Sequence, residues 1–298
     1  MSKEDGSGKV GRLVVIGGAE EKEGGDMDIL SRVVELAGGD QARIIVCSSP
    51  SGEAEEAFET YRKVFEELGV AEVIPAVIEE RNEADTPELL EAVQRATAVF
   101  ITGGDQLKLV ALIAGTHFAE GIRDRLFHDG LIVAGTSAGA AAMSGVMLIG
   151  GTSEGSVRRA DISLAPGLGL WRDTVVDTHF SQRGRVSRLM TVFAHNPQVL
   201  GIGIDENTAV EVQLGERLTV LGENAVMVFD GHVTHSSAPK ASDEDVLALT
   251  DALVHVLPKG YGFDLQTHRP ILPDGDRVPT PISPTSGGSR TAELGTGD

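Results

Sequence analysis

The sequence predicts an α/β protein with a three-layer, doubly wound architecture, in which helices cover both faces of a mostly parallel sheet. Through the first half of the chain, short β-branched runs alternate with amphipathic segments of helical length, which is typical of βαβ units. Glycine-rich turns follow three of these runs, at Gly17-Gly18, Gly103-Gly104 and Gly135 to Gly139. The chain has 298 residues, of which 41% are hydrophobic, so it can bury one sizeable core.

The expected elements of the first half alternate in order. The strands are 13–16, 44–47, 73–77, 98–101 and 131–134. The helices are 28–37, 53–68, a helix opening at Thr86-Pro87, 106–114 and 118–128. Proline suits the first position of a helix, because its missing N–H has no partner there. Parallel sheets place ligands at the carboxyl ends of their strands, so we expect the glycine turns to share one edge.

The second half predicts shorter strands with turn residues between them. They cover 201–204, 208–213, 217–221 and 225–229, and we expect them to be antiparallel additions to the sheet. Residues 1–10 are expected to be a flexible N-terminus and 11–272 a single α/β domain. Residues 273–298 are rich in Pro, Gly, Ser and Thr, a composition that predicts a disordered tail.

The net charge of the chain limits the classes of partner that we expect it to bind. The chain carries 45 acidic and 25 basic residues, a formal net charge of −20. A nucleic-acid surface needs clustered Lys and Arg, and an anionic membrane repels an acidic body, so we expect neither partner. The acidic body favours solubility and attracts cationic ligands.

The single cysteine excludes an intramolecular disulfide. Cys47 lies in an apolar run expected to be a buried strand, where a thiol is usually inert. The polar N-terminus lacks the apolar core of a signal peptide, and no apolar run approaches the ~18 residues of a membrane span. A cytoplasmic location is the expectation.

Ser137 is the candidate nucleophile. Gly135-x-Ser137-x-Gly139 fits the nucleophile-elbow pattern, in which a tight strand-to-helix turn lifts a serine hydroxyl out of the sheet. The pattern stands in its required context, after a predicted strand and before an Ala-rich helix start at Ala138. The alternative is a structural or anion-binding glycine turn without catalysis.

A serine nucleophile needs a base and an acid that orients it. His179 follows an apolar run and precedes a predicted helix, and Glu206 follows the strand 201–204. Asp205 competes with Glu206 by sequence alone. The resulting order Ser, His, Glu departs from the Ser, acid, His order of α/β-hydrolases. If the hydrolase order held, His232 or His235 would be the base.

Six segments, in this order along the chain, resemble the cyanophycinase family over residues 11–272. They are Gly17-Gly18-Ala19-Glu20, Gly103-Gly104-Asp105-Gln106, Gly135-Thr136-Ser137-Ala138-Gly139, Asp177-Thr178-His179-Phe180-Ser181-Gln182-Arg183-Gly184-Arg185, Gly203-Ile204-Asp205-Glu206 and His255-Val256-Leu257-Pro258-Lys259-Gly260-Tyr261. The Asp-x-His-Phe segment with its arginines, combined with Gly-Gly-Asp-Gln, is the most specific part.

The resemblance implies a serine exopeptidase with a flavodoxin-like fold, similar to the class I glutamine amidotransferase domain. Its substrate would be cyanophycin, a polyaspartate whose side chains carry arginine, and its product β-Asp-Arg dipeptides. Matching positions make Ser137 the nucleophile, His179 the base and Glu206 the acid. They also imply that a set of residues binds substrate: Gln106, Asp177, Arg183, Arg185 and Arg188. Thr178 departs from members that have Gln there. A homodimer is the implied assembly.

The residues themselves fit such a substrate. Each repeat unit of the polymer carries an α-carboxylate and a guanidinium, so its site needs both signs of charge. Six arginines lie between Arg158 and Arg188, a concentration in a chain with few basic residues. Arginine suits bidentate carboxylate binding, and Asp177 is a candidate partner for the substrate guanidinium. The alternative for each arginine is a helix surface paired with nearby acids.

The expected chemistry is acyl transfer, with the N–H groups of Ala138 and of the turn at Gly104 binding the oxyanion. No cofactor or metal is needed, and the pair Glu20-Glu21 lacks companion ligands at suitable spacing. Two other functions remain open: an aspartyl dipeptidase acting on short peptides, and a non-catalytic amidotransferase-like binding module. Amidotransferases place Cys at the elbow, whereas Cys47 lies elsewhere.

Overall fold

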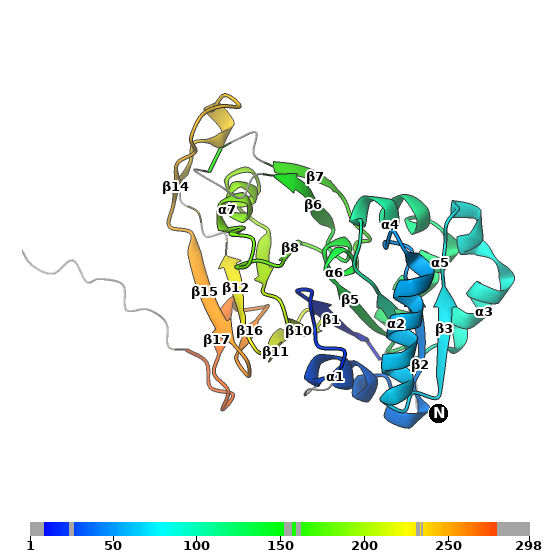
Figure 1. Cartoon of the computed structure of the whole chain (residues 1–298). Helices are drawn as coiled ribbons and strands as arrows, with labels where there is room; N and C mark the ends of the chain where they lie inside the picture. Colours follow the sequence, from blue (N-terminus) through cyan, green and yellow to red (C-terminus); the bar gives the residue numbers. More distant parts are fainter. Residues whose placement is uncertain are drawn as a thin grey trace, which may run out of the picture.

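A nine-stranded sheet forms the centre of the protein, in the order β17-β16-β11-β10-β1-β5-β4-β2-β3 (Figure 1). A computed structural model describes residues 9–23, 27–151, 157–158, 162–230, 233 and 235–278. The parallel strands are β1 (Arg12–Ile16), β2 (Arg43–Cys47), β3 (Glu72–Ala76), β4 (Ala98–Ile101) and β5 (Ile132–Thr136). Each lies within two residues of its predicted range, so the predicted α/β class is confirmed.

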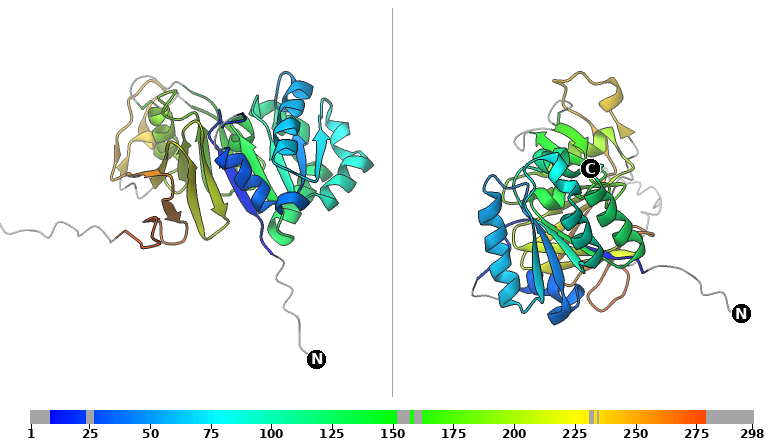
Figure 2. Two further views of the ribbon diagram at one scale, coloured as in Figure 1. Left: turned by 60° about the horizontal axis from the view of Figure 1, so that its bottom comes forward. Right: turned by 90° about the vertical axis from the view of Figure 1, so that its right-hand side faces the viewer.

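Helices cover both faces of the parallel strands and complete the three layers (Figure 2). One face carries α1 (Asp28–Leu36) and α2 (Ala54–Glu67), and the other carries α3 (Pro87–Arg95), α4 (Gln106–Ile113), α5 (His117–His128) and α6 (Ala138–Ala142). Successive strand residues point to opposite faces, so Val14 packs with the α1–α2 layer and Val15 with the other. Among the described residues, none of the helices combines the length and the hydropathy of a membrane span.

Antiparallel strands extend the sheet beside β1. They are β10 (Thr208–Gln213), β11 (Arg217–Gly222), β16 (Gly262–Asp264) and β17 (Arg269–Ile271). The strands predicted at 208–213 and 217–221 are therefore antiparallel additions, as expected.

A second sheet of four strands lies beside the first. Its order is β15 (Leu253–Pro258), β12 (Ala225–Asp230), β9 (Leu200–Ile204) and β8 (Thr174–Thr178). The strands expected at 201–204 and 225–229 thus form as β9 and β12, but they belong to this sheet and not to the main one. The reason is that β9 pairs in parallel with β8, which the sequence pattern did not separate from its neighbours.

The second sheet is covered on both faces. Ile202 and Val228 join the core shared with the main sheet, whereas the opposite face packs on α7 (Val186–His195) through residues such as Phe193. A β-carbon on Gly203 would lie 2.5 Å from Cγ of Phe180, so the glycine makes room for that ring.

Shorter elements complete the description. They are the hairpin β6 (Val146–Gly151) and β7 (Ile162–Pro166), the pair β13 (His235–Ser236) and β14 (Leu249–Thr250), and the 3₁₀ turns η1 (Gly39–Gln41), η2 (Arg81–Asp85) and η4 (Ala238–Lys240). After β17 the chain makes a turn in which the N–H of Leu272 donates to the carbonyl of Asp276 at 2.7 Å. Residues 279–298 of the expected tail, and 1–8 of the expected flexible N-terminus, lie outside the described residues.

The two sheets bring several turns to one place. The N–H of Ser137, after β5, donates to the carbonyl of Ile16 at 3.0 Å, and the N–H of His179, after β8, donates to that of Gly17 at 2.9 Å. The carboxyl ends of β1, β5 and β8 are thereby held together, and this is where parallel sheets place their ligands.

Candidate active site

Ser137 sits on a strained turn between β5 and α6. Its φ of 51° and ψ of −110° are unusual for a residue with a side chain. The flanking glycines permit the turn: a β-carbon on Gly135 would lie 2.9 Å from the carbonyl carbon of Gly139, and one on Gly139 would lie 2.4 Å from the oxygen of Ile101. The strained, glycine-flanked serine has the geometry of a nucleophile elbow.

The His179 imidazole joins Ser137 to Glu206. Its Nε2 lies 2.9 Å from Oγ of Ser137, and its Nδ1 lies 2.6 Å from Oε1 of Glu206. His179 also has a positive φ of 49°, and its ring lies against Gly18 in the turn after β1. The arrangement has the geometry in which a base, oriented by an acid, can activate a serine hydroxyl.

The turn after β9 separates the two candidate acids. Asp205 is 7% exposed, and its Oδ1 accepts the N–H of Ser181 at 2.9 Å, so it stabilises the turn after β8. Glu206 directs its carboxylate to His179, while its own N–H donates to Oε1 of Gln182 at 3.1 Å. The backbone contact to Gln182 fixes the turn that carries the acid, a role that the sequence pattern did not reveal.

Within the described residues, His235, another histidine considered as the base, takes no part in this chain of hydrogen bonds. His235 lies in β13, paired with Thr250 of β14. His232 lies outside the described residues. The Ser, His, Glu order therefore agrees with the contacts in the described part of the chain.

A pocket of about 120 Å³ opens beside Ser137. Its lining contains Ser137 and His179. It also contains the two residues expected to bind the oxyanion, Gly104 and Ala138, and the five expected to bind substrate: Gln106, Asp177, Arg183, Arg185 and Arg188. Gly104 has a φ of +138°, and a β-carbon there would lie 2.1 Å from the carbonyl oxygen of Pro50. The second glycine of this turn is therefore required by close packing. Gln106 donates from Nε2 to the carbonyl of Leu148 at 3.0 Å.

Asp177 at the end of β8 pairs with two arginines. Its side chain is 2% exposed; Arg188 binds both of its oxygens, with Nε 2.6 Å from Oδ2, and Nη1 of Arg185 lies 3.0 Å from Oδ1. Because both carboxylate oxygens are occupied, Asp177 is suited to orienting the arginines. Direct pairing with a substrate guanidinium, considered from the sequence, would have to displace them.

The guanidinium groups of Arg185 and Arg183 differ in how many partners they have within the protein. Nη1 of Arg185 also donates to the carbonyl of Thr178 at 2.7 Å, but its buried Nε has no hydrogen-bond partner. Burial lowers the pKa of the Arg185 guanidinium below its usual value; Asp177 opposes this, and the charges of Arg188 and Arg183 add to it. Arg183 is exposed, and within the described residues its guanidinium has no ion-pair partner. The pocket thus presents positive charge to an incoming anion.

The chain is similar in sequence to a known peptidase family. The model of peptidase family S51 matches residues 13–220. The cyanophycinase of Geminocystis herdmanii (strain PCC 6308) is 38% identical over 87% of this chain and 95% of its own length. That of Trichormus variabilis is 36% identical over 89% of each chain, and that of Synechococcus elongatus is 35% identical over 88% and 82%.

The chain belongs to peptidase family S51. A crystal structure of a peptidase from an acI-B1 Actinobacterium superposes with a TM-score of 0.61 at 22% identity, covering 84% of this chain and 98% of that one. At that identity the likeness shows the shared fold. The expected resemblance to the cyanophycinases is confirmed by the sequence comparisons.

Glu20 is a buried residue of this S51 peptidase to which sequence reasoning gave no role. Its carboxylate accepts hydrogen bonds from the hydroxyl groups of Tyr61 and Thr136, the latter at 2.6 Å, and forms an ion pair with Lys22 at 3.2 Å. Burial, together with the charge of Glu20, raises the pKa of Tyr61 well above its usual value. Glu20 therefore ties the turn after β1 to the residue that precedes Ser137.

Glu20 belongs to no metal-binding cluster among the residues that the structure describes. Within the described residues, no group of three or more His, Cys, Asp and Glu side chains is arranged to hold a metal ion. Glu20 instead uses its oxygens for protein contacts.

Proposed function

We propose that this protein is a serine exopeptidase that hydrolyses cyanophycin to β-Asp-Arg dipeptides through an acyl-enzyme on Ser137. The observation that carries the proposal is the continuous hydrogen-bonded path from Oγ of Ser137 through His179 to Glu206, beside a pocket lined by arginines. Relatives named cyanophycinase over most of the chain support the same substrate.

In the first step Oγ of Ser137 attacks the backbone carbonyl carbon of an aspartyl unit. Nε2 of His179 takes the hydroxyl proton, and the carboxylate of Glu206 holds the proton on Nδ1 and stabilises the imidazolium. The carbonyl oxygen becomes an oxyanion, for which the N–H groups of Ala138 and Gly104 are the proposed donors. Each such donor contributes about 10²–10³ in rate.

The acyl-enzyme forms when His179 gives its proton to the leaving amine and the C–N bond breaks. Water then attacks the ester carbon, His179 takes a proton from it, and that proton returns to Oγ of Ser137 as the C–O bond breaks. The complete reaction consumes one water for each peptide bond cleaved and needs no other co-reactant.

Arginines select the substrate in this proposal. The exposed guanidinium of Arg183 is the proposed donor for the α-carboxylate of a polymer unit, and Arg185, which lines the same pocket, adds positive charge there. Arg188 binds both carboxylate oxygens of Asp177, so its proposed role is to hold the pocket wall in place. Thr178 lines the pocket where some cyanophycinases have glutamine, and it offers a shorter side chain there.

The test is to incubate the purified protein with cyanophycin and separately with Asp-Leu, and to identify the products by mass spectrometry. We expect β-Asp-Arg from the polymer and no cleavage of Asp-Leu. Cleavage of Asp-Leu alone would establish the aspartyl dipeptidase, which the comparisons do not favour. A protein that cleaves neither would fit the non-catalytic binding module.

The proposal extends to three properties that the resemblance to the cyanophycinases implies. Residues 11–272 would form one catalytic domain, two copies of the chain would associate as a homodimer, and the protein would act in the cytoplasm. Analytical ultracentrifugation tests the dimer, and cell fractionation tests the location.

A further inference from the structure

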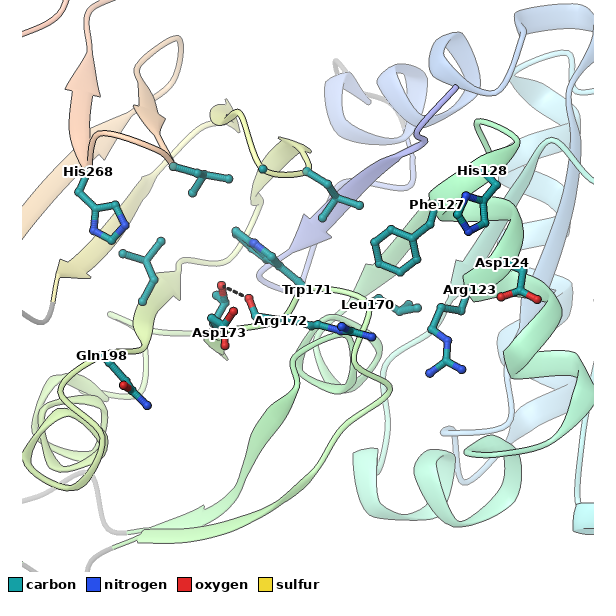
Figure 3. A pocket seen from close by; sticks show the side chains of 15 residues that line it. Arg123, Asp124, Phe127, His128, Leu170, Trp171, Arg172, Asp173, Gln198 and His268 are labelled. Carbon is teal, nitrogen blue, oxygen red and sulfur yellow. Dashed lines mark hydrogen bonds between the residues drawn. The ribbon is translucent and has the colours of Figure 1, made fainter. Parts of the chain in front are cut away.

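A cavity larger than the pocket at Ser137 lies away from that residue. It has a volume of about 850 Å³, compared with about 120 Å³ for the pocket at Ser137. It is an open groove whose walls come from α5, the start of β8, the segments before β8 and β9, and the turns β10–β11 and β16–β17 (Figure 3). We call it the Trp171 groove.

The groove lies at the opposite end of the second sheet from the active site. Thr174, the first residue of β8, lines the groove, whereas Thr178, the last residue, lines the pocket at Ser137. Four residue steps along a strand span about 13 Å. A ligand in the Trp171 groove therefore leaves the pocket at Ser137 accessible.

Two Arg-Asp dipeptides from distant parts of the chain face this groove. Arg123-Asp124 lies on α5, and Arg172-Asp173 lies in the segment that leads into β8. Figure 3 shows the side chain of Arg172 extending in the direction of the helix that carries Arg123. In the part of the chain that the structure describes, none of these four side chains has a hydrogen-bond or ion-pair partner.

These charges contrast with other arginines that are ion-paired within the protein, such as Arg62 and Arg188. Arg62 binds Glu59 and Glu66, and Arg188 binds Asp177. The groove instead holds two cations and two anions that remain available to a ligand. Its half-buried Phe127 ring adds an apolar face on which a guanidinium can stack.

The net charge of the protein decides between ligand classes. At −20 the chain repels a polyanion over long range. A polymer in which every unit carries one carboxylate and one guanidinium has no net charge and escapes that repulsion. Its carboxylates match Arg123 and Arg172, and its guanidinium groups match Asp124 and Asp173.

We propose that the Trp171 groove is a second, non-catalytic binding site for the zwitterionic aspartyl-arginine polymer. The identity of that polymer rests on the proposed function. Because the groove and the pocket lie at opposite ends of β8, the groove holds the enzyme on insoluble polymer while chain ends enter the pocket at Ser137.

The first test measures binding without cleavage. In the Ser137→Ala background, the variant R123A/R172A is compared with the unmodified groove by sedimentation with purified cyanophycin granules. Exposed ion pairs change affinity by about two- to fivefold each, so we expect binding weaker by about fivefold or more. The matched control is R43A/K63A, which removes two exposed positive charges from β2 and α2 and should bind as the parent does. Affinity of R123A/R172A within twofold of the parent, or an equal loss in the control, overturns the proposal.

The second test separates a zwitterionic ligand from an anionic one. We expect D124N/D173N to weaken granule binding as well, since it removes the partners of the guanidinium groups. Tighter binding by this variant would mean that the groove attracts anions in general, and the proposed ligand class would be wrong.

The third test distinguishes an error in the proposed role of the groove from an error in the proposed function. With Ser137 intact, R123A/R172A should retain the kcat/KM of the wild type on a soluble trimer of the aspartyl-arginine unit and lose rate on granules. Equal losses on both substrates would place the two arginines in the catalytic pathway and contradict a separate site. A wild type that cleaves neither substrate refutes the activity, whereas the sedimentation assay still tests the groove.

Discussion

The imidazole of His179 occupies the space that a β-carbon on Gly18 would fill. Such an atom would lie 2.4 Å from Cε1 and 2.6 Å from Nε2 of the ring. Gly18 also has a φ of +100°, which side-chain-bearing residues rarely adopt. The glycine turn after β1 therefore positions the proposed base through its lack of a side chain.

Gly18→Ala should lower kcat through displacement of the imidazole. A misplacement of about 1 Å can cost roughly 10² in rate. Gly38→Ala is the matched control, because Gly38 has a φ of +109° but no atom within 4 Å of the added carbon. Both variants should lose about 1 kcal/mol of stability from the backbone strain, and kcat should fall in Gly18→Ala alone. Equal kcat values for the two variants would contradict this role of Gly18.

Ser137→Ala should lower kcat on cyanophycin by about 10⁶ while the protein remains folded. The hydroxyl is the atom that forms the proposed acyl-enzyme, so no other side chain replaces it. Dipeptide release measures the rate, and circular dichroism checks the fold. Ser31→Ala, at an exposed position on α1, should behave as the wild type does. Full activity in Ser137→Ala would falsify the mechanism.

Glu206→Gln should reduce kcat far more than Asp205→Asn does. The neutral amide no longer stabilises the imidazolium and can favour the wrong tautomer of His179, an effect worth up to about 10⁴. An asparagine at 205 keeps an oxygen that can accept the N–H of Ser181, so its effect should be small. Steady-state kinetics on cyanophycin compares the two variants. The opposite ranking would make Asp205 the functional acid.

Arg188→Ala and Arg183→Ala should separate support of the pocket from substrate binding. Removing Arg188 takes the bidentate partner from Asp177, whose side chain is 2% exposed, and breaking such a buried pair costs about 3 kcal/mol or more. Arg183→Ala should change stability by less than about 0.5 kcal/mol and raise KM. Urea unfolding and kinetics provide both readouts. An unchanged KM in Arg183→Ala would remove that residue from the proposed binding site.

Cys47 should resist alkylation in the folded protein. Burial raises the pKa of its thiol to about 11, so at pH 8 about one molecule in 10³ carries the reactive thiolate, and the side chain is fully covered. Iodoacetamide at pH 8 should label Cys47 only after denaturation and should leave activity intact. As pH rises toward that pKa the thiolate fraction grows, but labelling should stay limited by burial. Rapid labelling with loss of activity would assign a role to the cysteine.

Local sequence patterns predicted most elements in the first half of the fold. The strand at 98–101 was predicted with the bounds it has, and the helix beginning at Pro87 starts at that residue. Both depend on short-range features, a buried β-branched run and a proline at a helix start. The second half was harder: the strand at 201–204 was expected to be an antiparallel addition to the main sheet, but it lies in the second sheet, paired in parallel with β8.

The sequence by itself determined the α/β class, the elbow at Ser137 and the candidate residues His179 and Glu206, because periodicity and motif spacing are local properties. Tertiary structure decided between Glu206 and Asp205, since only the fold of the turn after β9 shows which carboxylate reaches Nδ1 of His179. It also decided that Asp177 holds arginines, and that two Arg-Asp pairs 49 positions apart face one groove. Such relationships depend on long-range packing, which residue order does not encode locally.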